Sequence, residues 1–248
     1  MLIMEKQGPS LEHLLRTHNF KFNLQSLSLL AVKLIDTLET MHDNDILHGF
    51  LSPHNILVGR TVENKHVFLI SFKHSARLVS KKSVVFQENH TEIFEDKGIN
   101  EFSSINKCLG IPLSKKDDLE SAIYILLYLF HGGRISDNQF DKSDQVKKIV
   151  DYASWKSQSS VEVICKNTPP CFSMYLHHIR SHNPQDRPKY GFLRSLFSKN
   201  SDPKLGMQAL NILAYDLHKI ITNQQKSSGE LPVVKLHLDS EKEKISDQ

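Results

Sequence analysis

The chain has 248 residues, of which 39% are hydrophobic and 24% are charged, and its 31 Lys and Arg against 28 Asp and Glu give a formal charge of +3. These values are typical of a globular protein and exclude a disordered, collagen-like or disulfide-dense chain. The slight basic excess is spread along the chain, so we expect no nucleic-acid partner.

The cysteine count and the hydropathy pattern bear on the compartment. The three cysteines form no Cys-x-x-Cys pair, which excludes a four-cysteine zinc site and favours a reducing compartment. The first residues lack the basic leader and apolar run of a secretory signal. The longest apolar run, Ala122 to Phe130, is shorter than the roughly 20 residues that a membrane helix needs. We therefore expect an intracellular protein, in the cytoplasm or the nucleus, without a membrane partner.

The first third of the chain predicts a short helix, a long helix and a hairpin. Ser10 is a plausible cap for a short helix that begins at Leu11. Apolar residues recur at helical spacing over residues 27–41, which predicts an amphipathic helix. Two apolar runs at 56–58 and 67–70, separated by polar residues, predict a small β-hairpin. The segment 48–55 is then a tight loop between the long helix and the hairpin.

The remainder predicts a mostly helical body. Residues 71–112 show no period and resemble a functional or mobile connection. A helix that opens at Asp117 and Asp118 is apolar on every face up to Phe130, which places it at the centre of a domain. Amphipathic stretches predict four further helices near 144–154, 170–181, 190–198 and 205–223. We expect one domain over 1–222 and a polar tail, too poor in apolar residues to fold alone, over 223–248.

Short motifs carry a resemblance to a known family. The chain contains Gly-Pro-Ser-Leu at 8–11, a His-x-x-x-x-Pro-x-Asn loop at 48–55, Ser-Ile-Asn at 104–106, Leu-Gly-Ile at 109–111, Asp-Asp-Leu-Glu-Ser at 117–121 and Val-Glu-Val-Ile-Cys-Lys at 161–166. In this order the set resembles the casein kinase I family of protein kinases over roughly residues 1–200. The resemblance implies a mainly α (α+β) fold, the kinase large lobe with its small β-hairpin. It also implies that the chain begins at the hinge, without the small lobe.

The resemblance places the catalytic positions on residues that lack the required chemistry. Kinases use an aspartate to accept the hydroxyl proton, and an asparagine and a second aspartate to hold magnesium. Here Phe50 stands at the proton-acceptor position and Ser52 at the position of the loop lysine. Of the Mg-ATP positions, Asn55 matches and Ser71 replaces the metal aspartate, with Lys73 close by. No catalytic residue is intact, and we expect no cofactor.

Other candidate residues have structural interpretations. We expect His48 to be a packed structural histidine, and Asp118 to cap its helix and hold the loop backbone, which is also its role in the family. Asn55 is equally consistent with a metal ligand and with a residue that satisfies loop backbone groups. Lys115 and Lys116 resemble the basic pair through which this family receives acidic substrates, although a solvated pair explains them as well.

Two histidines with the i, i+4 spacing of metal ligands, His178 and His182, are not expected to bind zinc. A helix-breaking Asn-Pro pair follows them directly, and the sequence offers no third ligand nearby.

The sequence therefore predicts a pseudokinase that acts as a binding or regulatory module. The alternative is an active serine/threonine kinase of this family that uses Mg-ATP at an atypical site. We expect protein partners, either an active kinase of the same family or its substrates. A second copy of the chain is a further candidate, through an exposed apolar hinge face that includes Met1–Met4, Leu57 and Ile70.

Overall fold

The computed structural model describes residues 7–17, 22–59, 66–78, 98–135 and 145–199, all within the first of the two units into which the chain divides. Its α-helices are α1 (Leu11–Thr17), α2 (Leu24–Asp43), α3 (Ile105–Cys108), α4 (Lys115–Phe130), α5 (Gln145–Gln158), α6 (Val161–Ile164), α7 (Pro170–Ser181) and α8 (Tyr190–Ser198). The strands are β1 (Ile46–Leu47), β2 (Ile56–Val58), β3 (Val67–Leu69) and β4 (Ala76–Arg77), and one 3₁₀ turn, η1, spans Phe72–His74.

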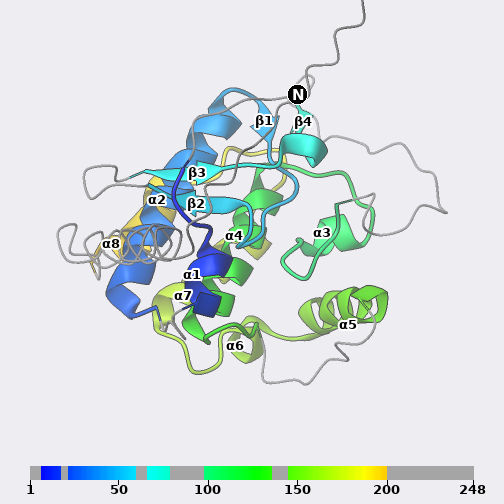
Figure 1. The fold of residues 1–248 in the computed structure, drawn as a ribbon. Coiled ribbons are helices and arrows are strands. Elements are labelled where there is room, and N and C mark those ends of the chain that lie inside the picture. The colour runs from blue at the N-terminus through cyan, green and yellow to red at the C-terminus, as the bar shows by residue number, and fades with distance from the viewer. Residues whose placement is uncertain (1–6, 18–21, 60–65, 79–97, 136–144, 200–248) are drawn as a thin grey trace, which may run out of the picture. The chain divides into compact units, whose positions relative to one another are not determined.

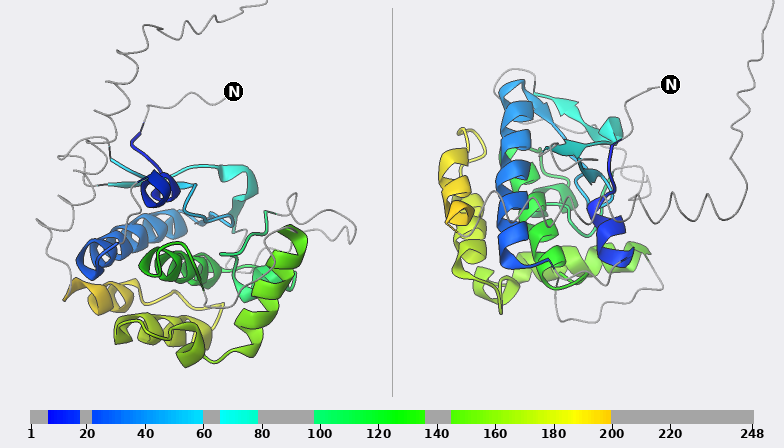
Figure 2. Two further views of the ribbon diagram at one scale, coloured as in Figure 1. Left: turned by 60° about the horizontal axis from the view of Figure 1, so that its bottom comes forward. Right: turned by 60° about the vertical axis from the view of Figure 1, so that its left-hand side comes forward.

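Four helices form the body of the described part. Helix α4 packs on α2 and on α7, and α8 in turn packs on α2 and on α7 (Figures 1 and 2). Helix α4 lies at the centre because its residues are apolar on nearly all faces, and those from 119 to 127 are all buried. This arrangement confirms the predicted mainly helical fold with a small β component.

The predicted elements of the first third are confirmed. The 27–41 stripe lies in α2, whose N-cap Asn23 accepts a hydrogen bond from the Ser26 N–H at 2.8 Å. Strands β2 and β3 pair antiparallel, with Leu57 opposite Phe68. The Gly8–Ser10 segment adds to this hairpin, because the Gly8 N–H donates to the Val58 carbonyl at 3.1 Å and Ser10 bridges to Leu57.

The segment predicted to be irregular contains short elements. Between 71 and 112 the described residues form η1, β4 and α3, and β4 pairs with β1. These elements are too short to impose a hydrophobic period, so the sequence pattern does not show them. Residues 79–97, the predicted helix at 205–223, the domain boundary at 222 and the tail at 223–248 lie outside the described residues.

Two expectations about exposure and membrane contact can be compared with the structure. Leu57 and Ile70, expected on an exposed hinge face, are partly buried, and Leu57 bridges to Ser10 of the segment that lies along β2. Met1–Met4 lie outside the described residues. Within the described ranges, no helix combines the length and the apolar character that crossing a membrane requires.

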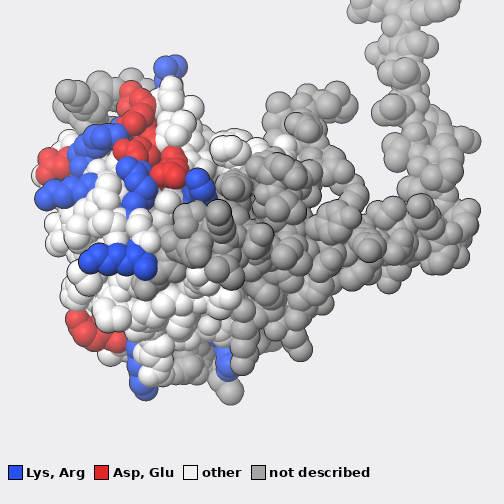
Figure 3. Space-filling model, turned by 90° about the vertical axis from the view of Figure 1, so that its left-hand side faces the viewer, with Lys and Arg blue, Asp and Glu red and all other residues white. Residues whose placement is uncertain are grey.

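The outer side of α2 and α8 carries charges of both signs. Arg187 contacts Glu39 and Asp43, each at 2.8 Å, while Arg194 contacts Asp36 at 3.2 Å and Glu39. Figure 3, which views this side, shows basic and acidic side chains intermixed rather than gathered into a patch of one sign. These pairs link α2 to α8 and its preceding loop.

Candidate functional site

The site is built on the loop that follows β1, and a carboxylate of α4 anchors it. Asp118 is 3% exposed, and its two oxygens accept hydrogen bonds from the backbone N–H groups of His48 and Gly49, each at 2.8 Å. Burial alone would raise the pKa of Asp118, but its hydrogen bond with His42 and the backbone N–H of Gly49 keep the pKa below the usual value. An ionised carboxylate therefore fixes the entry of the loop.

The sequence assigns Asp118 a second role, as the helix cap, and this assignment is wrong. The N-cap of α4 is Ser114, whose backbone N–H and hydroxyl donate to the Asp117 carboxylate at 2.8 and 3.1 Å. Asp118 is one residue further along the helix and points towards the loop. The reciprocal contact between Ser114 and Asp117 is a capping box, which leaves Asp118 available for tertiary contacts.

A histidine that the sequence analysis did not single out completes the anchor. His42, at the end of α2, is fully buried, with Nε2 3.0 Å from Asp118 Oδ2 and Nδ1 2.7 Å from the Tyr190 hydroxyl. This chain of contacts joins α2, α4 and α8 beneath the loop. Its only sequence signal is the polar side chain at the end of an otherwise apolar helical stripe.

The backbone of the loop is held along its whole length. Each of the four successive carbonyl oxygens of residues 48–51 accepts a hydrogen bond from a side chain. In the order of these carbonyls, the donors are the Ser75 hydroxyl at 3.1 Å, the Lys107 ammonium, the Asn55 amide at 3.0 Å and the Asn100 amide at 3.1 Å. Because three of these donors, Ser75, Asn100 and Lys107, come from other segments of the chain, tertiary contacts fix the loop in addition to its own Asn55 contact.

Phe50 lies between an imidazole and an ammonium. Its ring packs edge-on against the His74 ring with centroids 4.9 Å apart, and Lys107 Nζ lies 5.7 Å from its centroid. Gly49 permits this approach, because it has φ +68° and a Cβ there would meet the His74 carbonyl oxygen at 2.7 Å. The position expected to accept a proton thus carries an aromatic ring that has no lone pair to offer.

The two residues that the resemblance places at the loop-lysine and metal-asparagine positions, Ser52 and Asn55, carry no charge. Ser52 is buried, and its carbonyl accepts the Asn55 N–H at 3.0 Å. The Asn55 side chain is also buried, and its amide nitrogen donates to the Phe50 carbonyl. Of the two interpretations of Asn55, this geometry supports the one in which it satisfies loop backbone groups.

The segment that the resemblance places at the metal position is strained and exposed. Ser71 has φ +69° and ψ +59°, in the left-handed region that costs a non-glycine residue about 1–3 kcal/mol, and its side chain forms no capping hydrogen bond. Phe72 and Lys73 follow in η1, and both are exposed. A neutral hydroxyl beside an ammonium is a poor donor set for Mg²⁺, which prefers carboxylate oxygens. The residues present therefore do not fit a magnesium–nucleotide complex.

Two buried groups of the site have lowered pKa values. Burial lowers the pKa of His48, whose Nε2 lies 3.1 Å from the Ile70 carbonyl oxygen, so the ring is neutral and holds the start of η1. Burial also lowers the pKa of Lys107 to about 8, although the nearby charge of Asp118 opposes this shift. At neutral pH Lys107 remains mostly a cation, bonded to the Gly49 carbonyl.

The basic pair and the histidine pair lie away from this loop. Lys115 Nζ is 3.5 Å from Asp45, and Lys116 Nζ is 3.4 Å from the His182 carbonyl. His178 packs against Phe192 with ring centroids 4.8 Å apart. Across the described ranges, no three His, Cys, Asp or Glu side chains gather in a way that could hold a metal ion.

Sequence reasoning missed the donors that hold the loop from the side of α3. Lys107 directly follows the Ser-Ile-Asn motif and Asn100 precedes it, but nothing in the residue pattern indicates that either side chain reaches the loop. Lys107 is 8% exposed, and a buried lysine is unexpected from an isolated basic residue in a polar stretch. No protein-family model matches this chain.

Proposed function

We propose that this protein is a kinase-like large lobe of the casein kinase I type that does not transfer phosphate and acts as a binding or regulatory module. One observation carries the proposal. The loop of residues 48–51 keeps a complete set of backbone contacts, but Phe50 fills the position where a proton acceptor would stand.

The order of elements supports the kinase-like assignment. A long helix, a loop anchored by a carboxylate of a central helix, a small hairpin and a left-handed turn follow one another in the order that the sequence motifs imply. A fold of this kind does not by itself imply phosphate transfer, because the activity depends on which residues the fold carries at the site.

The expected loss of phosphate-transfer rate favours an inactive protein. Loss of a general base costs about 10²–10⁴ in rate, and loss of a preorganised electrostatic contact costs about 10²–10³. Phe50 and Ser71 together remove one of each, so even without full additivity the rate falls by roughly 10⁴ or more. Kinases turn over about 1–100 times per second, which leaves too slow a reaction to serve as an activity.

A phosphate-transfer assay tests this proposal. The full chain is incubated with Mg²⁺, radiolabelled ATP and casein, beside an active kinase of the casein kinase I family. We expect no label above the enzyme-free background on either casein or the chain itself. Transfer that scales with the amount of chain would contradict the proposal.

The alternative function, an atypical serine/threonine kinase, requires another proton acceptor near Phe50. The titratable side chains in contact with that ring are His74 and Lys107. If transfer is found, His74→Ala and Lys107→Met should abolish it, and Lys115→Ala should not. Lys107 already donates to the Gly49 carbonyl, so the geometry favours a structural role for it.

We further propose that the partners of this module are proteins, either an active kinase of the same family or a substrate of such a kinase. A purified active kinase of the family provides a direct test. Co-elution with the chain, lost when the exposed loop-side residues Phe72 and Lys73 are changed, supports this proposal, whereas separate elution at micromolar concentrations contradicts it.

A further inference from the structure

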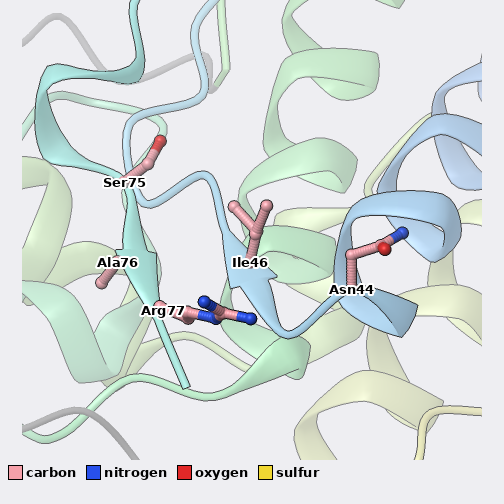
Figure 4. A pocket seen from close by; sticks show the side chains of 5 residues that line it. All are labelled: Asn44, Ile46, Ser75, Ala76 and Arg77. Atoms are coloured by element: carbon pink, nitrogen blue, oxygen red, sulfur yellow. The ribbon is translucent and has the colours of Figure 1, made fainter. Parts of the chain in front are cut away.

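The polar walls of the cavity between the end of α2 and the β1–β4 pair are engaged within the chain. Its volume is about 430 Å³, and it is lined by Asn44, Ile46, Ser75, Ala76 and Arg77 (Figure 4). The side chains of Asn44 and Ser75 already donate to backbone carbonyls, at 2.8 and 3.1 Å. Arg77 adds one cation, but Asp45, between two lining residues along the chain, is an exposed carboxylate. The cavity therefore does not select the charge of a ligand.

The corner where α7 meets α8, in contrast, contains a buried nitrogen without a partner. The two helices pack on each other (Figure 2), and the His178 ring of α7 lies against the Phe192 ring of α8 with centroids 4.8 Å apart. His178 Nε2 is buried and has no hydrogen-bond partner among the described residues. Such atoms are rare in folded proteins and need an explanation. A neutral imidazole lowers the cost, because its one proton can lie on Nδ1 and leave Nε2 without a hydrogen.

The groups around His178 disfavour a positive charge on its ring. The His182 ring lies 5.9 Å away between centroids, and its Nε2 is 3.1 Å from the Asp186 carbonyl oxygen. Lys116 Nζ lies 3.4 Å from the His182 carbonyl, and Lys189 is the N-cap residue of α8. Burial, His182 and Lys189 all lower the pKa of His178, in this order of importance. The Asp186 side chain is exposed, and no described carboxylate forms an ion pair with either imidazole.

The same corner is linked to the anchor of the loop at residues 48–51. Phe192 and Tyr190 lie in the first turn of α8. The Tyr190 hydroxyl is 2.7 Å from His42 Nδ1, and His42 Nε2 is 3.0 Å from Asp118 Oδ2. Asp118 in turn accepts the hydrogen bonds of two backbone N–H groups of the loop. A displacement of the first turn of α8 can therefore act on the loop through one continuous chain of contacts.

We propose that the α7–α8 corner is an acid-sensitive switch that controls how firmly the loop of residues 48–51 is held. At neutral pH the His178 ring is neutral and packs on Phe192. When the ring gains a proton, its Nε2–H has no acceptor and the neighbouring cations repel it, so the first turn of α8 moves away from α7. The inference rests on these contacts and on no part of the proposed function, so the two can fail separately.

The direction of the pH effect follows from where the proton binds more tightly. The pKa of His178 is lowered in the folded chain, so the unfolded chain binds this proton more tightly. Stability is therefore lost as the pH falls through the ordinary histidine pKa of 6.5. Burial also lowers the pKa of His48, so the loop has an acid-sensitive group of its own. The test must separate the two histidines.

Hydrogen exchange of the full chain, followed by mass spectrometry at about pH 7.5 and about pH 5.5, tests this proposal. Exchange rates are corrected for the intrinsic effect of pH on exchange. Peptides over 190–198 report on α8, peptides over 46–51 report on the loop, and peptides over 119–130 of the central helix α4 are the reference. Local opening shows as loss of protection in the first two segments without a matching loss in the third.

The variants isolate each step of the switch. His178→Phe keeps a ring against α8 but cannot be protonated, and its matched control is His177→Phe, at the next residue of α7, where an exposed imidazole pairs with Glu162 at 2.7 Å. Lys189→Met removes a repelling cation at an exposed residue without touching the packed ring. Tyr190→Phe removes the hydroxyl that reaches His42. Circular dichroism at neutral pH checks that each variant is folded.

We expect acidification to lower the protection of α8 by about threefold or more in the wild type and in His177→Phe, and by less in His178→Phe and Lys189→Met. The loop should lose protection together with α8, and Tyr190→Phe should reduce the response of the loop while α8 still responds. A wild-type response in both His178→Phe and Lys189→Met, or an equal loss of protection in α4, would overturn the switch. A loop response that neither His178→Phe nor Tyr190→Phe reduces would overturn the link to the loop and assign its acid response to His48.

Discussion

The loop at residues 48–51 and the turn at residues 71–74 lie against each other, but the structure holds them in different ways. The loop has an ionised anchor, Asp118, and a side-chain donor on every carbonyl. The turn begins at a left-handed serine without a capping contact and exposes Phe72 and Lys73. The difference shows that tertiary contacts fix the backbone of the loop, whereas the turn beside it presents its side chains to solvent.

A second comparison concerns two buried lysines, Lys107 in α3 and Lys156 in α5. Lys107 donates to one loop carbonyl, whereas the fully buried Lys156 donates to the carbonyls of Glu101 and Ser103 and lies 4.2 Å from the Tyr124 ring centroid. Burial lowers the pKa of each to about 8. The same type of contact thus fixes the loop at Lys107 and joins α5 to the chain before α3 at Lys156.

Removal of the loop anchor should give the largest effect. We expect Asp118→Ala to lower the free energy of unfolding by about 3–5 kcal/mol, because it leaves two buried N–H groups and His42 without their acceptor. Urea denaturation measures this change. Asp45→Asn, which removes an exposed carboxylate with one long contact to Lys115 and suits the left-handed backbone at φ +56°, is the control and should cost less than about 1 kcal/mol. Equal costs would mean that Asp118 does not anchor the loop.

Lys156→Met should have the next largest effect. The substitution preserves an unbranched side chain but leaves the Glu101 and Ser103 carbonyls without a donor, at a cost of about 2–4 kcal/mol. Lys148→Met, which removes a partly exposed ion pair to Glu101, should cost less than about 1 kcal/mol in the same urea series. A stabilised Lys156→Met variant would show that burial of the ammonium outweighs its hydrogen bonds.

The two lysines also predict a pH dependence. Between pH 8 and the ordinary lysine pKa of 10.5, each is neutral in the folded chain but protonated in the unfolded chain, so each lysine adds stability as the pH rises. The gain reaches at most about 3 kcal/mol for each lysine. From about pH 9 the cysteines oppose this gain, because burial raises the pKa of Cys165 to about 12 and also raises the pKa of Cys108 and Cys171, so the unfolded thiols ionise first. Above about pH 10 the tyrosines oppose it as well, because burial raises the pKa of Tyr152 to about 12.

Thermal unfolding followed from pH 7 to 11 measures this dependence. Lys107→Met and Lys156→Met should each lower the slope of stability against pH between pH 8 and 10, whereas Lys148→Met should leave this slope unchanged. Equal slopes in the wild type and in both buried-lysine variants would contradict the burial of two cations.

The smallest effect is expected at the basic pair. Lys115→Ala and Lys116→Ala should each change the free energy of unfolding by less than about 0.5 kcal/mol, because their contacts, at 3.5 and 3.4 Å, are long. Calorimetry of both variants tests whether the loop depends on them. A loss comparable to that of Asp118→Ala would place this pair in the scaffold.

The sequence predicted the helical body well and the site contacts poorly. The stripe over 27–41 and the apolar run to Phe130 fix α2 and α4, because a helical period reports which face is buried. The hairpin followed from two apolar runs. The donors Asn100 and Lys107 could not be predicted, because they reach the loop from 49 and 58 residues further along the chain, and a local residue pattern does not report such long-range side-chain contacts.

Binding of Mg-ATP to the full chain separates an inactive binding module from a kinase that still holds its nucleotide. A ligand at 100 times its dissociation constant stabilises a folded protein by about 2.7 kcal/mol, so differential scanning calorimetry over a nucleotide titration is sensitive to any real site. We expect no saturable rise in melting temperature with Mg-ATP, because Ser71 and Lys73 offer the metal no carboxylate. A saturable rise at micromolar Mg-ATP, lost in Asn55→Ala but not in Lys166→Ala, would contradict it.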